Sequence, residues 1–218
     1  MLAVVEVLAL ILALALAGAA FERIAEARDR KRFPAPGRLI DVGGRRLHLC
    51  CAGERQPGRP TVVLEAGAAL WSYHWRRVQP EVARFARVVA YDRAGLGWSD
   101  LASSPRSPAQ VVAELHALLE QAGEPGPYVL AGHSLGGIYV REFARRYPEE
   151  VVGMVLVDAM HERMGAARDL PRMATRSLVA TLQLLRMASV LAWLGILRTV
   201  GRALLRAQVR SVQQLGDE

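Results

Sequence analysis

Cysteine is nearly absent from this sequence of 218 residues, which contains only Cys50 and Cys51. The two are adjacent, and neighbouring residues of a strand point to opposite faces, so they are poorly placed to bridge each other. The sequence therefore provides no disulfide framework and no cysteine-based metal site.

Lysine is also nearly absent, because Lys31 is the single lysine among 28 basic residues. The net charge of +7 would fit nucleic acid or anionic lipid as a partner. However, the sequence lacks an aromatic-interleaved basic tract, a zinc-finger pattern and a P-loop. We therefore predict no nucleic-acid partner, no metal and no organic cofactor.

No basic segment precedes the apolar N-terminal run, residues 2–21, in which Glu6 is the only charged residue. A run of about 20 apolar residues is long enough to span a bilayer core, so residues 1–32 predict a single-pass membrane anchor with a basic flank. A signal peptide, which would make the protein secreted or periplasmic, normally begins with a basic segment. A helix packed on the body of the protein is a third alternative. The basic residues between positions 23 and 32 predict that the body lies on the cytoplasmic side.

Residues 33–160 alternate between short apolar runs and segments with helical spacing. Strands are expected at residues 38–42, 45–51, 61–65, 87–91, 128–133 and 151–157. Helices are expected at 75–85, 107–123 and 135–147, and Gly43-Gly44 predicts a two-residue hairpin turn. The pattern indicates an α/β fold with a mostly parallel sheet and an N-terminal antiparallel hairpin, which binds ligands beyond the carboxyl ends of its strands.

The segment GHSLG, residues 132–136, connects an expected buried strand to an expected helix. In this setting G-x-S-x-G forms a sharp turn that exposes a nucleophilic serine, here Ser134. Gly132 and Gly136 would supply the flanking positions, which must lack bulk. The Leu135 N–H, at the helix start, would stabilise developing negative charge. The alternative is a glycine-rich turn with an incidental serine.

Histidines before and beside this motif are expected to be structural. The side chain of His133 should point away from that of Ser134, because neighbours in a strand alternate in direction. His48, His74 and His116 are interpreted as surface or packing residues.

With these motifs the chain resembles the α/β-hydrolase superfamily, in its capped, serine-nucleophile, esterase-like branch. The resemblance runs from about Arg38 to Arg163. It places the segment LEAGA, residues 64–68, at an oxyanion loop, with the Ala68 N–H as a second donor and Glu65 where many members have histidine. The segment YDRAGLGWS, residues 91–99, is similar to a family loop in which we expect Asp92 and Ser99 to be structural.

A serine nucleophile in this family implies acyl transfer from a small acyl substrate, as in the hydrolysis of an ester, thioester or amide, or a related C–C cleavage. The family also takes an acid and a histidine from later strands, in the order Ser, Asp or Glu, His. His161 is the only histidine after Ser134, so the resemblance implies a chain truncated inside a partial helical cap, residues 161–218. A makeshift set of Asp158 and His161 is an alternative that would need hydrogen-bond reach to the serine.

Three hypotheses about function follow. The first is a truncated, membrane-anchored serine hydrolase that acts through Ser134 and a backbone oxyanion hole, and whose catalytic competence is in doubt without its base. The second is a non-catalytic membrane-associated protein derived from a hydrolase, with its arginine-rich C-terminal segment on a membrane or a partner. The third is a complete enzyme that uses Asp158 and His161 or borrows a histidine from a second chain.

Overall fold

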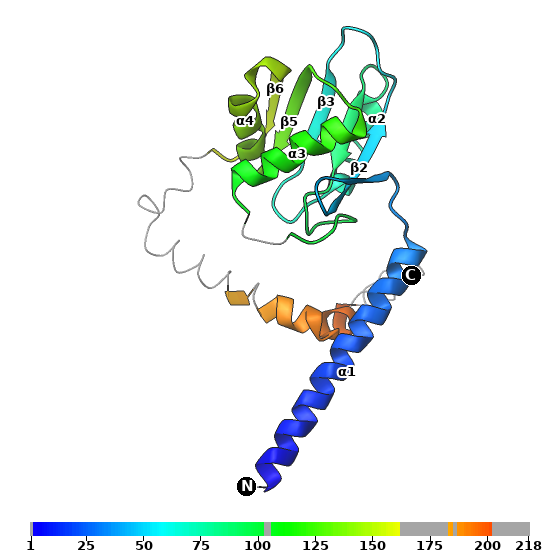
Figure 1. Cartoon of the computed structure of the whole chain (residues 1–218), viewed down its shortest axis with the longest axis vertical. Coiled ribbons are helices and arrows are strands. Elements are labelled where there is room, and N and C mark those ends of the chain that lie inside the picture. The colour runs from blue at the N-terminus through cyan, green and yellow to red at the C-terminus, as the bar shows by residue number, and fades with distance from the viewer. Residues whose placement is uncertain (1, 103–105, 162–182, 185–186, 202–218) are drawn as a thin grey trace, which may run out of the picture. The chain divides into compact units, whose positions relative to one another are not determined.

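The structure, a computed structural model, describes residues 2–102, 106–161, 183–184 and 187–201 (Figure 1). It divides into two units, which are treated separately. One unit comprises residues 35–166, and the other combines residues 1–34 with residues 167–218. The predicted cap, residues 161–218, falls largely outside the described residues.

A six-stranded mixed sheet forms the centre of the 35–166 unit, with strand order β1-β2-β4-β3-β5-β6. The strands are β1 (Arg38–Asp41), β2 (Arg46–Ala52), β3 (Thr61–Glu65), β4 (Val88–Tyr91), β5 (Tyr128–His133) and β6 (Val151–Val157). Strand β2 pairs antiparallel with β1 and β4, whereas the β4–β3, β3–β5 and β5–β6 pairs are parallel. The predicted fold class, a mostly parallel sheet with an N-terminal antiparallel hairpin, is confirmed.

The hairpin between β1 and β2 turns at the two glycines, as predicted. Gly43 and Gly44 have φ angles of 94° and 87°, in the left-handed region that glycine adopts without strain. The Asp41 carboxylate accepts hydrogen bonds from both of their N–H groups, at 2.8 and 2.9 Å. The turn thus sets the register of the first antiparallel pair.

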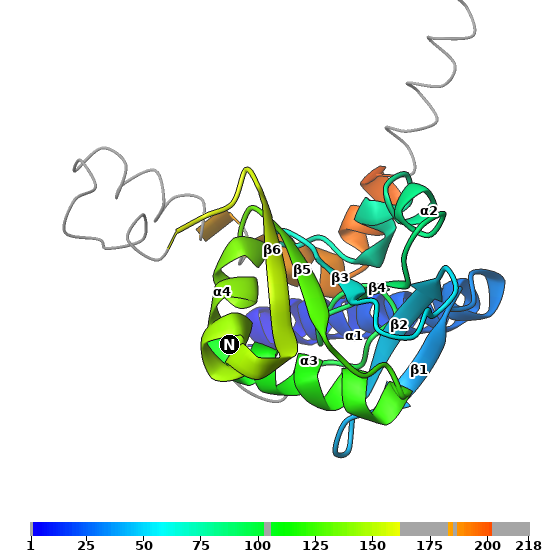
Figure 2. The same cartoon turned by 90° about the horizontal axis from the view of Figure 1, so that it is seen from above.

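Helices α3 (Pro108–Ala122) and α4 (Gly136–Arg146) cover one face of the sheet (Figure 2). Ser107 and Gln110 form a capping box at the start of α3, and Gly123 ends the helix in a left-handed conformation. Buried side chains of both helices pack on alternate strand residues to form the larger core. They include Val112, Leu115, Leu118, Leu119, Val140 and Phe143, against Val63, Val89, Tyr128 and Leu130.

On the opposite face, the helix expected at residues 75–85 is wrong. The structure has a 3-10 turn, η1 (Ser72–Trp75), and a single helical turn, α2 (Gln79–Val82). Pro80 explains the difference, because a helix running through it from Trp75 would lose one N–H donor and bring the proline ring against the carbonyl of residue 76. Phe85, the last residue of the expected helix, is 62% exposed.

Strand β6, which follows a 3-10 turn, η2 (Pro148–Glu150), lies at the end of the sheet and pairs with β5 within the described residues. Four of its apolar side chains are exposed: Val152, Val155, Leu156 and Val157. Within the described residues β6 is therefore an apolar edge strand, and such an edge is a template for association.

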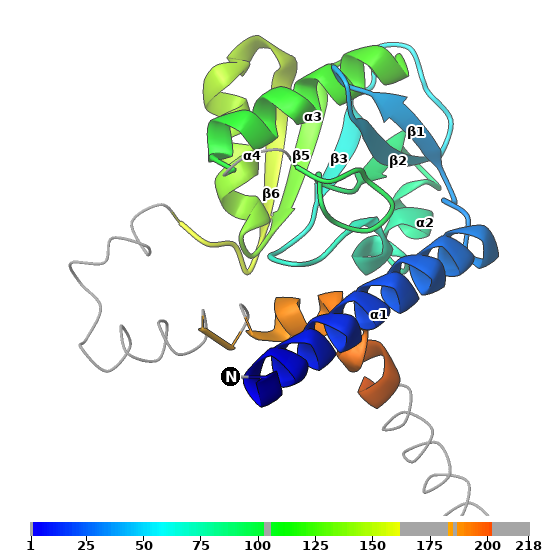
Figure 3. The same ribbon diagram turned by 60° about the horizontal axis from the view of Figure 1, so that its bottom comes forward.

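The other unit contains α1 (Leu2–Arg32) and helical turns over residues 187–193 and 196–201 (Figure 3). Within the part of α1 from Val5 to Arg32, a window of 18 residues has a mean hydropathy of 2.1, and 6% of that window is buried. By length and composition this helix is able to cross a membrane. It extends eleven residues beyond the apolar run at 2–21, through a charged stretch that ends in Arg30, Lys31 and Arg32.

Candidate active site

Ser134 lies in the turn that connects β5 to α4. Its φ angle is +51°, a left-handed conformation that is strained for a residue other than glycine. The Ser134 N–H donates to the Val157 carbonyl at 3.2 Å, and the Ser134 carbonyl accepts from the N–H groups of Gly137 at 3.0 Å and Met160 at 2.8 Å. The sharp, strained turn expected of G-x-S-x-G is therefore present, and backbone hydrogen bonds on both sides hold it.

Glycines flank Ser134 because the packing leaves no room for a side chain. A Cβ atom on Gly136 would lie 2.6 Å from the Glu65 carbonyl oxygen, and one on Gly132 would lie 2.7 Å from Val140. A Cβ on Gly137 would lie 2.5 Å from the Cβ of Ala159. The start of α4 therefore packs closely on the end of β3 and on the loop that follows β6.

The loop after β3 contains the second predicted oxyanion donor, Ala68. The Leu70 N–H closes a turn on the Gly67 carbonyl at 3.3 Å, and Ala69 has a φ of +53°. The contact of Gly136 with the backbone of Glu65 and Ala66 places this loop beside the Ser134 turn. Within the described part of the chain, the N–H groups of Ala68 and Leu135 make no hydrogen bond.

Arg93, which sequence reasoning did not single out, holds the loop that contains Ala68. Its guanidinium donates to the carbonyls of Ala66 at 2.6 Å and Gly67 at 2.5 Å, and it forms a buried ion pair with Glu65. Tyr91 donates its hydroxyl to the same carboxylate. The signal was available in the sequence, because a charged Glu65 in a buried strand requires a partner.

Burial governs the electrostatics of this cluster. Glu65 is fully buried and Arg93 is 6% exposed. Desolvation raises the pKa of the Glu65 carboxyl, and the Arg93 charge and the Tyr91 hydroxyl oppose this rise. The ion pair thus compensates two buried charges and at the same time fixes the carbonyl directions of the loop.

Asp92 and Ser99 stabilise the neighbouring loop, as expected. The Asp92 carboxylate accepts from the Ser72 N–H at 2.8 Å, the Trp98 N–H at 2.9 Å and the His48 Nδ1 at 3.0 Å. The Ser99 hydroxyl donates to the Asp92 carbonyl at 2.6 Å. Burial tends to raise the pKa of Asp92, but these hydrogen bonds outweigh burial and lower the pKa below its ordinary value.

His48 is buried and structural, and its hydrogen bonds define its tautomer. The Gly37 N–H donates to its Nε2 at 3.0 Å, so Nε2 is the acceptor and Nδ1 carries the proton toward Asp92. His133 stacks on His74 at 4.8 Å and meets the edge of Trp75, on the face of the sheet opposite α4. These contacts fit the structural roles expected of the three histidines.

Among the described residues, neither Asp158 nor His161 makes a hydrogen bond with the Ser134 hydroxyl. Asp158 is exposed and has a φ of +41°, and His161 is exposed. The Met160 N–H ties their loop to the backbone of Ser134, not to its side chain. Among the described residues, the Ser134 hydroxyl makes no hydrogen bond.

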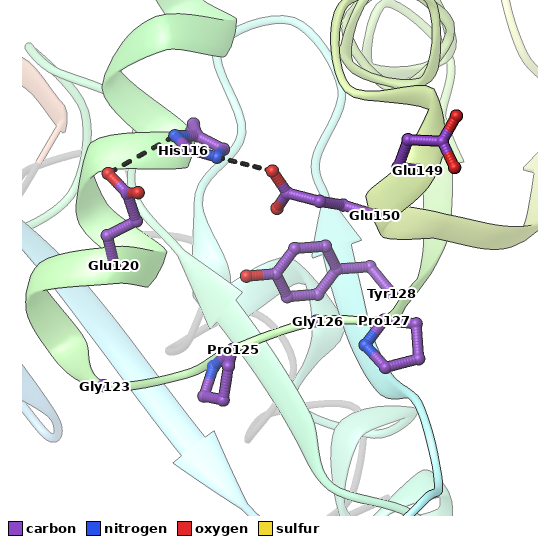
Figure 4. Close-up of a pocket in the computed structure, with 9 residues that line it drawn as sticks. All are labelled: His116, Glu120, Gly123, Pro125, Gly126, Pro127, Tyr128, Glu149 and Glu150. Carbon is purple, nitrogen blue, oxygen red and sulfur yellow. Dashed lines mark hydrogen bonds and ion pairs between the residues drawn. The ribbon is translucent and has the colours of Figure 1, made fainter.

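A pocket of about 850 Å³ lies at the other end of the parallel strands (Figure 4). In it His116 bridges Glu120 and Glu150 and stacks on Tyr147 at 3.9 Å. Tyr128, which lines the pocket, begins β5, whereas Ser134 follows the last residue of that strand. This pocket therefore belongs to the amino end of the sheet and is remote from the serine.

No cluster of three or more histidine, cysteine, aspartate or glutamate side chains suited to a metal ion occurs in the part of the chain that the structure describes. Cys50 and Cys51 are half-buried free thiols. Desolvation raises the pKa of Cys51 to about 11, which disfavours the reactive thiolate form of this side chain.

Comparison with known proteins relates the chain to hydrolases. The profile of the alpha/beta hydrolase fold family matches residues 60–211. An AB hydrolase superfamily protein of Gibberella zeae is 39% identical over 111 residues, which cover 49% of this chain and 34% of that protein. A thermophilic esterase from Thermogutta terrifontis superposes with a TM-score of 0.50 at 26% identity, over 56% of this chain and 44% of the esterase.

A vacuolar membrane protein of Saccharomyces cerevisiae is 30% identical over 140 residues, which cover 54% of this chain and 21% of that protein. The chain thus spans less than half the length of each of these three proteins.

Proposed function

Because the chain belongs to the alpha/beta hydrolase fold family, we propose that it provides the nucleophile and the oxyanion hole of a serine hydrolase that acts on an ester, thioester or amide. Ser134 is the nucleophile in this proposal, and the N–H groups of Ala68 and Leu135 are the oxyanion donors. The membership itself supports hydrolase chemistry, and the esterase likeness favours an acyl substrate.

The positive φ of Ser134 carries the proposal. Strain of this kind persists only where the surroundings enforce it, and it is frequent at functional sites. Here the backbone hydrogen bonds of Ser134 and the close packing of Gly136 on the β3 backbone hold it, at the carboxyl end of a parallel strand where such folds bind ligands. An incidental serine would not require this conformation.

The expected reaction has two steps. The Ser134 Oγ forms a bond to the carbonyl carbon and gives its proton to a general base, while the carbonyl oxygen becomes an oxyanion between the two N–H groups. The carbonyl re-forms as the leaving group departs with a proton, and water then hydrolyses the acyl-serine. We assign to the described residues the nucleophile and the donors but not the base, since the Ser134 hydroxyl has no partner among them.

The lack of a hydrogen-bond partner for the Ser134 hydroxyl among the described residues favours a second candidate function. Without a base a serine is a poor nucleophile, and only residual catalysis from the oxyanion hole remains. A non-catalytic membrane-associated protein derived from a hydrolase would have this arrangement.

We further propose that α1 anchors the chain in a membrane. The helix is apolar over residues 2–21, and its exposed side chains there include Leu10, Leu12, Leu14 and Leu16. Basic residues follow directly, which favours the body of the protein on the cytoplasmic side. The vacuolar membrane relative supports a membrane location, and a cleaved signal sequence is the competing interpretation.

Labelling with a fluorophosphonate probe tests the serine. We expect the purified chain to be labelled and the Ser134→Ala variant to remain unlabelled at the same probe concentration. The heat-denatured chain is the control for unspecific reaction. Equal labelling of both variants would contradict the assignment of Ser134, whereas a folded chain that resists the probe would favour the non-catalytic alternative.

A further inference from the structure

Residues 187–201 form two short helical stretches, 187–193 and 196–201, which are separated by a turn at Gly195, and both expose apolar side chains. This set, called the apolar row below, comprises Met187, Val190 and Trp193 on the first stretch and Ile196, Leu197 and Val200 on the second, which are 40–62% exposed. Six large apolar side chains exposed on one short segment indicate a surface that is covered by lipid or by a partner.

The opposite side of this segment packs closely on α1. A Cβ atom on Gly18 would lie 2.6 Å from the Leu194 carbonyl oxygen, so the two backbones cross in contact. Gly195, with a φ of +70°, faces the ring of Phe21. The apolar row therefore belongs to the same unit as the apolar length of α1.

Arg198 fixes the crossing by pairing with two acids of α1. Its guanidinium binds Glu22 through Nε at 2.8 Å and Nη2 at 2.6 Å, and it also donates to Asp29. Glu22 and Asp29 are seven residues apart, which places them on one face of the helix, two turns from each other. Since Glu22 directly follows the run at 2–21, this ion-pair cluster lies at the level where α1 changes from apolar to charged.

We infer that residues 187–201 lie in the interfacial zone of a lipid bilayer, beside α1, with their apolar row toward the acyl chains. The inference rests on the proposal that α1 is a membrane anchor. Trp193 suits this depth, because tryptophan concentrates at membrane interfaces. A segment with an apolar surface lies in such an interface with that surface toward the acyl chains.

A groove between the two helices supports lipid as the occupant. It has a volume of about 440 Å³ and is lined by apolar residues with one cation. The lining residues are Leu16, Ala19, Ala20, Arg23, Ile24 and Trp193. An acyl chain fits an apolar groove, and a lipid phosphate would pair with the Arg23 guanidinium.

Depth-dependent quenching in vesicles tests the inference on the full chain. Both native cysteines are first replaced by serine, as Cys50→Ser and Cys51→Ser. An environment-sensitive fluorophore is then attached to a new cysteine at Val190→Cys or Leu197→Cys. The matched control is Glu81→Cys, because the Glu81 side chain in α2 is exposed. The vesicles contain phosphatidylcholine, phosphatidylglycerol and nitroxide-labelled lipids. We expect loss of most emission at positions 190 and 197 and little loss at position 81.

Co-flotation of the same samples distinguishes the two proposals. A chain that floats with the vesicles but keeps full emission at positions 190 and 197 would overturn the inference and leave the anchor intact. A chain that does not float contradicts the anchor, and this inference with it.

Charge reversal tests the ion pairs that hold the segment. We expect Arg198→Glu to reduce quenching at position 197, and added Glu22→Arg and Asp29→Arg substitutions to restore it. Unchanged quenching in Arg198→Glu would show that these pairs do not hold the segment at the interface.

Discussion

Glu65 and Arg93 show how single residues position the loop beside Ser134. A carboxylate buried in a strand is costly unless it is paired and hydrogen-bonded. The partner of Glu65 comes from the loop after β4, and the same guanidinium turns the Ala66 and Gly67 carbonyls toward itself. The interaction that compensates the buried charge of Glu65 therefore also fixes the conformation of the candidate oxyanion loop.

Replacing one member of this pair should be more harmful than replacing both. We expect Arg93→Met to lower the free energy of unfolding by about 3–5 kcal/mol, because it leaves the Glu65 carboxylate buried without its cation. The double variant Glu65→Leu, Arg93→Met should recover much of that loss. Urea unfolding of the three proteins gives the comparison, and a double variant less stable than Arg93→Met would contradict the argument.

Asp92 should make the stability of the 35–166 unit depend on acid pH. Its pKa in the folded chain is below its ordinary value of 3.8, so its stabilisation is complete above that value and is lost as the pH falls through the lower folded pKa. Asp92→Asn cannot titrate. We expect it to be less stable by about 1–3 kcal/mol near neutral pH, with the difference shrinking below about pH 4. A difference that is constant with pH, in urea unfolding, would refute this assignment.

At the scale of elements, the contact between α4 and β3 decides where the Ser134 turn lies. Helix α4 begins where the sequence predicts a helix. The sequence does not predict, however, that Gly136 contacts the backbone of Glu65. Backbone atoms cannot move aside as a flexible side chain does, so the contact fixes the distance between the two elements.

Adding a methyl group at this contact should therefore be costly. We expect Gly136→Ala to destabilise the chain by about 1–3 kcal/mol through overpacking. Gly153→Ala is the matched control in β6, where the added Cβ would meet Val129 at an ordinary 3.4 Å. Thermal unfolding of both variants checks the prediction, which fails if the two melt at the same temperature.

At the scale of the whole molecule, the chain combines a sheet unit with an apolar-helix unit. Leu12 and Leu14, 60% and 64% exposed, belong to the apolar length of α1. We expect Leu12→Arg, Leu14→Arg to abolish co-flotation with vesicles, since each arginine at a helix centre costs about 2.5–3.5 kcal/mol on insertion.

Leu101→Arg is the control for this experiment, because Leu101 is 81% exposed in the other unit. It should float like the unaltered chain. Flotation of the double variant would show that α1 is not what holds the protein on the vesicle.

Much of the fold was predictable because its signals are local. The hairpin at Gly43-Gly44, the capping box of α3 and the strand–Ser134–helix connection each depend on neighbouring residues, and the structure contains all three. The helix expected at 75–85 does not form, because Pro80 interrupts the segment despite its apolar helical spacing. The role of Arg93 is not visible in a local pattern, because its partners lie more than 20 residues away in the sequence.

The sequence by itself determined the order of strands and helices, the fold class and the position of Ser134, since period, turn residues and capping are encoded over a few residues. Only the tertiary structure decided the strand order β4-β3-β5, which brings the Ala68 loop beside Ser134, and the pairing of Glu65 with Arg93. It also showed that the Ser134 hydroxyl has no partner among the described residues. These features depend on contacts between residues that are distant in the sequence and come together when the sheet forms. A local sequence pattern does not specify such contacts.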